Sequence, residues 1–105
     1  MTASVCKTTS TAAADGLVIQ LSGRITAPNA DQVEEDIATM RESAPDQDVI
    51  LDIADLEYIS SAGLRVIMRL LKRAGNLTVR NAQPEVYDVF EMTGLTVLMD
   101  VHRVP

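Results

Sequence analysis

The chain has 105 residues, a formal net charge of −6, one cysteine and one histidine. This length suits a single core, so we expect residues 1–105 to form one domain. The acidic balance and the presence of only three aromatic residues argue against a nucleic-acid partner, because phosphates are bound by Lys and Arg and single strands by aromatic stacking. One cysteine and one histidine cannot supply a zinc site, and we expect neither a metal nor another cofactor.

The N-terminal sequence lacks the basic-then-apolar order of a signal peptide. No apolar run approaches the roughly 20 residues that a membrane-spanning helix needs. A single cysteine excludes an internal disulfide and suits a reducing compartment. We therefore expect a cytoplasmic protein with no membrane association.

The first half of the chain predicts a hairpin and then a helix. A Thr-rich segment from about Val5, the turn signal Asp15-Gly16 and the apolar segment 17–23 indicate two antiparallel strands. Asn29 and Gln32 then form a capping-box pair that predicts the start of a helix. Its apolar stripe is predicted to comprise Ala30, Val33, Ile37 and Met40, and its solvent-exposed face to carry Glu34, Glu35 and Asp36.

The middle of the chain predicts a buried strand and a second helix. Residues 49–56 are apolar and rich in β-branched side chains, which is typical of a strand buried on both faces. The helix after the strand ends at Gly75-Asn76, a C-cap signal. Its apolar stripe is predicted to be Leu64, Ile67, Met68 and Leu71, and its opposite, basic stripe Arg65, Arg69, Lys72 and Arg73.

The last third predicts a strand at 77–82, a helix from Pro84 to Gly94 and a final strand at 95–104. Strands separated by helices require crossover connections and mainly parallel pairing. The predicted fold class is α/β: a mixed, mostly parallel sheet with an N-terminal hairpin and helices packed against it. Since the chain stops at Pro105, we expect a helix after the last strand to be absent or very short.

Sequence motifs of common enzymes are missing. Neither a phosphate-binding Gly-rich loop nor the G-x-S-x-G elbow occurs. His102 stands close to Pro105 and is expected to be an exposed residue of a frayed tail. Asp52 and Asp55 are expected in a turn at a strand end. We expect no enzymatic activity.

Ser60 and Ser61 stand between the buried strand and the basic helix, at the carboxyl end of a strand, which is the usual functional edge of an α/β sheet. One hydroxyl can cap the helix, and the sequence leaves open which serine does so. The other would then face outward, where a phosphate is compatible with the positive end of the helix dipole. Two interpretations remain: a cap with a polar turn, or a cap beside a phosphorylation site.

Three segments of the chain also resemble one family. "VILDIADLEYISSAGLRVIMRLLKRAG" resembles the central motif of anti-sigma factor antagonists, the STAS domain family. "LSGRITAPNADQVEEDI" is similar to the family's Gly-(Glu/Arg)-Leu-Asp segment and first helix, and "VRNAQPEVYDVFEMTGLTVLMDV" to its Pro-x-Val and Ser/Thr-Gly-Leu segment. The segments occur in the family's order over nearly the whole chain. Thr26 and Ser60 stand where the family often has acids.

The resemblance implies a STAS domain that acts as an anti-sigma factor antagonist in a partner-switching pathway. The expected partners are a GHKL-type anti-sigma factor that is also a serine kinase, which binds the unphosphorylated form and releases it on phosphorylation, and a PP2C-type phosphatase that restores it. By motif position the acceptor is Ser61, with Ser60 as the alternative. The kinase-binding surface is expected to comprise Thr26, Ala27, Tyr58, Ile59, Ser60, Ala62, Gly63, Arg65 and Arg69. The alternative function is a STAS module that senses a ligand or serves as a scaffold in a larger signalling complex without being phosphorylated.

Overall fold

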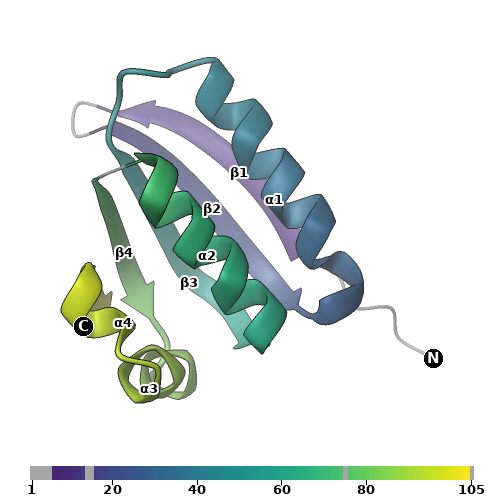
Figure 1. Cartoon of the computed structure of the whole chain (residues 1–105), viewed down its shortest axis with the longest axis vertical. Helices are drawn as coiled ribbons and strands as arrows, with labels where there is room; N and C mark the ends of the chain where they lie inside the picture. The colour runs from purple at the N-terminus through teal and green to yellow at the C-terminus, as the bar shows by residue number, and fades with distance from the viewer. Residues whose placement is uncertain (1–5, 14–15, 75, 105) are drawn as a thin grey trace.

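A five-stranded sheet runs through the molecule (Figure 1). The computed structural model describes the backbone of residues 6–13, 16–74 and 76–104 and the side chains of 16–74 and 76–104. The strands lie in sequence order: β1 (Cys6–Ala13), β2 (Gly16–Ile25), β3 (Val49–Ile59), β4 (Leu77–Ala82) and β5 (Asp100–Arg103). β1 pairs antiparallel with β2, and every later pair is parallel. The predicted α/β fold is therefore confirmed, while Asp15 of the predicted turn and Gly75 of the predicted C-cap lie outside the described residues.

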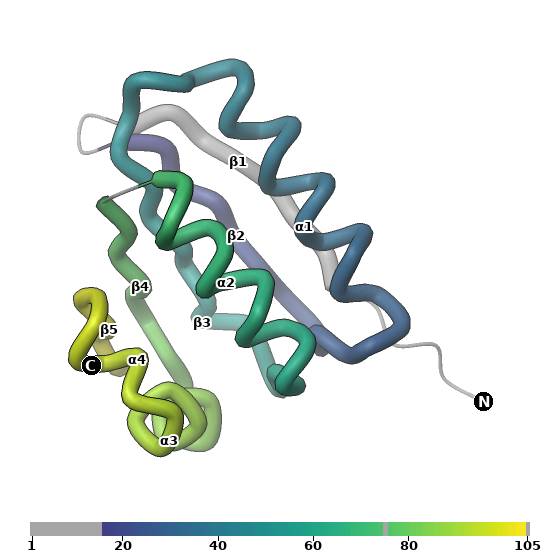
Figure 2. The backbone as a smooth tube through the Cα atoms, viewed as in Figure 1, coloured from purple at the N-terminus to yellow at the C-terminus, as the bar shows by residue number. Residues whose placement is uncertain are grey.

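The described residues form four helices: α1 (Ala27–Glu42), α2 (Ser61–Ala74), α3 (Pro84–Met92) and α4 (Leu95–Leu98). Figure 1 shows α1 and α2 side by side across one face of the sheet, with α3 beyond the tip of β4. Figure 2 shows β5 beside α4 near the C-terminus. Because α1 and α2 each follow a parallel strand, their N-termini lie at the same edge of the sheet, the edge where β2 and β3 end.

An aliphatic core fills the space between the sheet and the helices. Alternate residues of β2 and β3 are buried in it: Leu17, Ile19, Leu21, Val49, Leu51 and Ile53. Each fully buried Leu or Ile side chain contributes about 1.5–3 kcal/mol relative to an exposed one. Phe90 of α3 and Leu95 of α4 are buried in the same cluster. One core thus contains residues of β2, β3 and β4 and of all four helices.

The buried face of α2 is wider than its predicted stripe. Leu64 and Ile67 are buried as predicted, but Met68 is exposed, and two residues outside the prediction, Val66 and Leu70, are buried. The physical reason is that α2 packs against α1 as well as against the sheet, so the apolar arc has to cover two neighbours. On α1 the predicted stripe is confirmed, with Ala30, Val33 and Ile37 buried and Met40 half-buried.

Helix α1 begins three residues earlier than predicted. Its N-cap is Thr26 rather than Asn29, and a proline, Pro28, occupies the first turn. Asn29 still takes part in a capping box, but from position N3: its Oδ1 accepts a hydrogen bond from the Thr26 N–H at 2.8 Å. Gln32, the other member of the predicted pair, instead donates to Asp36 Oδ1 at 3.0 Å. The helix start therefore follows Ile25 of β2 with no intervening loop except Thr26.

The predicted final strand at 95–104 is wrong over its first half. Residues 95–98 form the short helix α4, and only Asp100–Arg103 pair with β4. Gly94 has φ +80, the left-handed region that glycine adopts without strain, and this reversal lets α4 place Leu95 in the core. The reversal leaves Val97 and Leu98 on the surface.

Two acidic residues and the histidine lie in strands rather than in a turn and a tail. Asp52 and Asp55 belong to β3, which continues to Ile59, so the predicted strand-end turn is wrong. Asp52 Oδ1 accepts hydrogen bonds from the Ala54 N–H and from Asn81 Nδ2, both at 3.2 Å, and its Oδ2 lies 3.5 Å from Arg80 Nε. His102 is exposed, as predicted, but within β5.

Among the helices of the described residues, none is long and apolar enough to cross a membrane.

Candidate functional site

The two adjacent serines have different roles at the start of α2. Ser60 is the cap: its Oγ accepts a hydrogen bond from the Gly63 N–H at 3.2 Å, and its carbonyl oxygen accepts one from the Leu64 N–H at 2.9 Å. The bond from Gly63 satisfies a backbone donor that a helix start otherwise leaves without a partner, and the bond from Leu64 is the first regular hydrogen bond of α2. Ser61 is the first residue of α2 and is exposed. Of the two arrangements that the sequence left open, the structure has Ser60 as the cap and Ser61 facing solvent.

The end of β3 is bound directly to the end of β2. Ile25 and Ile59 are register partners, and the Ser60 N–H donates to the Ile25 carbonyl at 2.9 Å, which extends the pairing by one residue. Thr26, the residue after Ile25, therefore lies beside the serine pair. Since Thr26 caps α1 and Ser60 caps α2, two helix N-termini with their partial positive charges lie at this edge.

Gly63 permits the close approach of α2 to the two strand ends. A Cβ atom at this position would lie 2.7 Å from Ile25 Cγ2 and 2.7 Å from Ile59 Cγ1, closer than real Cβ contacts come. Any larger residue would push the first turn of α2 away from the sheet. The glycine thus fixes where Ser61 sits relative to Thr26 and Ala27.

Arg24 and Tyr58 form a surface pair that the sequence analysis did not identify. The Arg24 guanidinium carbon lies 4.6 Å from the centre of the Tyr58 ring, a cation–π geometry, and 42 % of Tyr58 is exposed. The two residues are register partners one position before Ile25 and Ile59. Because those isoleucines face α2, the alternation of strand side chains places Arg24 and Tyr58 on the opposite face of the sheet. Arg24 is the charged residue of the otherwise largely apolar β2, which marks it as a surface residue in the sequence. Its partner Tyr58 follows only from the β2–β3 register.

An open depression of about 400 Å³ adjoins this pair. It is lined by Arg24, Glu57, Gln83, Pro84 and Glu85, which come from β2, β3 and the start of α3. The Gln83 side-chain amide donates to the Ala54 carbonyl at 2.7 Å and ties the α3 end of the depression to β3. The depression therefore carries one positive group, Arg24, and two negative groups, Glu57 and Glu85.

The predicted basic stripe of α2 is exposed, but its members differ in their partners. Arg69 Nη1 lies 3.0 Å from Glu34 Oε1 of α1, so this arginine and one residue of the predicted acidic face hold the two helices together. Arg65, one turn closer to Ser61, forms no ion pair within the described residues. The prediction treated Arg65 and Arg69 as equivalent, and the structure distinguishes them.

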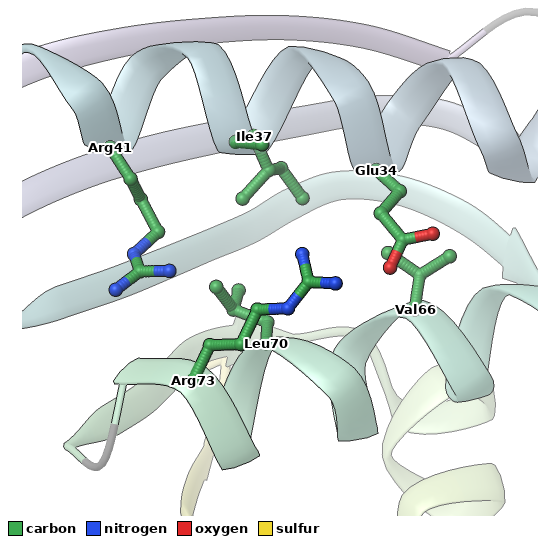
Figure 3. A pocket seen from close by; sticks show the side chains of 7 residues that line it. Glu34, Ile37, Arg41, Val66, Leu70 and Arg73 are labelled. Carbon is green, nitrogen blue, oxygen red and sulfur yellow. The ribbon is translucent and has the colours of Figure 1, made fainter.

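A small groove lies between α1 and α2 beside this contact (Figure 3). Figure 3 shows Glu34, Arg41 and Arg73 around an apolar floor of Ile37, Val66 and Leu70. The groove holds about 20 Å³ of free volume, roughly the space for one water. It is too small for an organic ligand.

The structure brings eight of the nine predicted binding residues to one edge of the molecule. The ninth, Arg69, lies about two turns along α2. Four of them are exposed: Ala27, Tyr58, Arg65 and Arg69. Three others are half-buried, namely Thr26, Ser60 and Ala62. Ile59 and Gly63 are buried, so they shape the surface and offer no side chain to a partner. Ser61 is exposed among them.

The chain matches known proteins over most of its length. The sequence model of the STAS domain covers residues 7–104. BtrV of Bordetella bronchiseptica, which is named as an anti-sigma factor antagonist, is 36% identical over 92 residues, spanning 83% of this chain and 78% of that protein.

Solved structures of antagonists have the same fold. An anti-sigma factor antagonist from Mycobacterium paratuberculosis superposes with a TM-score of 0.82 at 19% identity, over 93% of this chain and 86% of that one. The anti-sigma factor antagonist SpoIIAA in its unphosphorylated form superposes with a TM-score of 0.74 at 19% identity, over 92% and 87% of the two chains. The relatives are regulatory proteins by name. With its sheet order, its serine-capped second helix and a family match over nearly every described residue, this chain belongs to the STAS domain family.

Proposed function

We propose that this protein is an anti-sigma factor antagonist that is switched by phosphorylation of Ser61. In its unphosphorylated form it would bind an anti-sigma factor that is also a serine kinase of the GHKL type. Phosphorylation would release it, and a PP2C-type phosphatase would restore binding. The proposal places this exchange in the cytoplasm and assigns the chain no catalytic step of its own.

The observation that carries the proposal is the division of labour between the two serines. The Ser60 hydroxyl is engaged in the Gly63 hydrogen bond, whereas Ser61 is exposed at the first position of α2. A kinase can reach an exposed hydroxyl without unfolding the domain. The name of the relative BtrV and the solution of SpoIIAA in both a phosphorylated and an unphosphorylated form support the same function.

The position of Ser61 also suits a phosphate. The kinase would transfer the γ-phosphoryl group of ATP to Oγ, with loss of the hydroxyl proton to a base and release of ADP. The product carries about −1.5 to −2 charges at neutral pH, next to the partial positive charge of the α2 N-terminus. The modified domain therefore keeps its fold, and the effect of the phosphate falls on a partner's surface.

The surface around Ser61 combines features of protein interfaces. Tyr58 and Arg24 form an exposed aromatic–guanidinium pair on one side, and tyrosine and arginine are enriched among residues that dominate binding energy. Arg65 follows on α2, and Ala27 begins α1 on the other side. On a chain with a net charge of −6, Arg65 is an exposed positive group in the helix that begins at Ser61, and it suits an acidic patch of the kinase.

The test is phosphorylation with the cognate kinase and ATP, followed by intact mass and peptide mapping. We expect one phosphate, on Ser61, no labelling of Ser61→Ala, and retained labelling of Ser60→Ala. A label on Ser60 or on a threonine would contradict the assignment. A chain that binds its partner but is never labelled would favour the sensing or scaffold function instead.

A further inference from the structure

Arg65 is an exposed cation in the second turn of α2 that forms no ion pair with any acidic side chain of the described residues. Two other arginines do form ion pairs within the fold. Arg69 of α2 pairs with Glu34 of α1, and Arg80 of β4 pairs with Asp52 of β3. Arg65 has no such structural use.

Arg65 stands four residues after Ser61 in the same helix. At 3.6 residues per turn, positions i and i+4 lie on the same face, with their Cβ atoms about 5–6 Å apart. An anion at i followed by a cation at i+4 is the more favourable order of such a pair. In the unmodified protein the partner at i is a neutral hydroxyl, so the pair is incomplete.

We propose that phosphorylation of Ser61 completes this pair, and that the phosphate and Arg65 form an intrahelical ion pair that is part of the switch. The inference rests on the proposed function, because it takes Ser61 as the acceptor. Arginine can present two N–H donors to a phosphate, and charge-assisted bonds of this kind are about twice as strong as neutral ones.

The pair has a consequence for partner binding. Before modification, the Arg65 guanidinium is available to a carboxylate of the kinase. After modification it is held by the chain's own phosphate, so one event both adds negative charge to the surface and withdraws a positive group from the partner.

Two other arginines are alternative partners for the phosphate. Arg69 is two turns from Ser61 and is paired with Glu34. Arg24 lies on Tyr58, on the face of the sheet away from α2. Helical spacing therefore favours Arg65 over both.

The test is a ³¹P NMR pH titration of the full chain with phosphoserine encoded at position 61 during translation. A nearby cation stabilises the phosphate dianion and lowers its second pKa from the usual value of about 6. Arg65→Gln should therefore raise this pKa by about 0.3–0.6 units, Arg65→Lys should keep a large part of the original value, and Arg69→Gln should leave it unchanged. In 1 M salt, where the screening length is about 3 Å, the difference between the parent and Arg65→Gln should shrink.

Equal phosphate pKa values in the parent and in Arg65→Gln would overturn the inference, as would a shift caused by Arg24→Gln in place of Arg65→Gln. An amide NMR spectrum of each variant verifies that the fold is retained. Because the phosphoserine is encoded, the titration does not depend on a kinase. A failed ion pair is thus distinguishable from a wrong acceptor, which the labelling experiment above detects.

Discussion

The Ser60 hydroxyl oxygen accepts a hydrogen bond from the Gly63 N–H at 3.2 Å, so the first of two adjacent serines is committed to capping α2. The same bond leaves Ser61 as the exposed hydroxyl of the pair. Two neighbouring residues of identical chemistry are thereby given separate tasks by their positions relative to the helix start. The predictions below test this division and the surface built around it.

Ser60→Ala should destabilise the domain by about 1 kcal/mol, because the substitution removes the side-chain acceptor at the helix start. Ser60→Asp should retain most of the stability, since aspartate caps as well as serine does. Ser61→Ala should change the free energy of unfolding by no more than about 0.5 kcal/mol. Urea denaturation measures all three, and a larger loss in Ser61→Ala than in Ser60→Ala would reverse the assigned roles.

Gly63→Ala should destabilise the domain by about 1–3 kcal/mol even though alanine is the better helix former. The added Cβ would lie 2.7 Å from side-chain atoms of both Ile25 and Ile59. The matched control is Gly94→Ala, where an added Cβ meets nothing within 4 Å and the cost comes from the positive φ alone. Thermal unfolding with amide NMR should show shifts at Ile25 and Ile59 only for Gly63→Ala, and a neutral Gly63→Ala would refute the close packing.

Arg65→Glu should weaken binding of the unphosphorylated protein to the proposed kinase roughly three- to tenfold, or about 0.7–1.4 kcal/mol, and reduce the salt dependence of the association rate. Lys72→Glu makes the same charge change in the last turn of α2, far from Ser61, and should have a much smaller effect. Arg69→Glu should fall between them, because it also places two carboxylates together at the contact with Glu34. Surface plasmon resonance at several salt concentrations gives the rates, and equal effects of Arg65→Glu and Lys72→Glu would place the partner elsewhere.

Tyr58→Ala should weaken kinase binding by more than about 1 kcal/mol, whereas Tyr58→Phe should preserve most of the affinity, since the ring supports the Arg24 guanidinium. Domain stability should change less than kinase binding in either variant, because Tyr58 lies outside the buried core and 42 % of it is exposed. Isothermal titration calorimetry distinguishes the two. An unchanged affinity for Tyr58→Ala would exclude this pair from the interface.

The elements of the fold followed from local patterns, and the errors arose where tertiary contacts decided the outcome. β4 was predicted with its observed bounds because Leu77–Ala82 alternates and is flanked by turn signals. Residues 95–98 are apolar enough for a strand, but the reversal at Gly94 and burial of Leu95 made them helical. At α1, Thr26 and Asn29 are both good capping residues, and the direct continuation from Ile25 of β2 made Thr26 the cap.

The site was predictable in position more than in detail. Its place at the ends of β2 and β3 followed from the order of strands and helices. The sequence could not separate Ser60 from Ser61, because either hydroxyl can cap and only the backbone path fixes which one does. It could not show that Arg69 meets Glu34 or that Arg24 lies on Tyr58, because both contacts join segments that are distant in the chain.

The most direct test of the account compares the affinity of the kinase for the unmodified protein with its affinity for protein that carries an encoded phosphoserine at position 61. The control carries the phosphoserine at Ser43, an exposed residue at the C-terminal end of α1, which is some 24 Å along that helix from its start. We predict that phosphoserine at 61 raises the Kd at least about tenfold, or about 1.4 kcal/mol, and that phosphoserine at 43 leaves it nearly unchanged. Equal Kd values for the unmodified protein and for the protein modified at Ser61 would contradict the account.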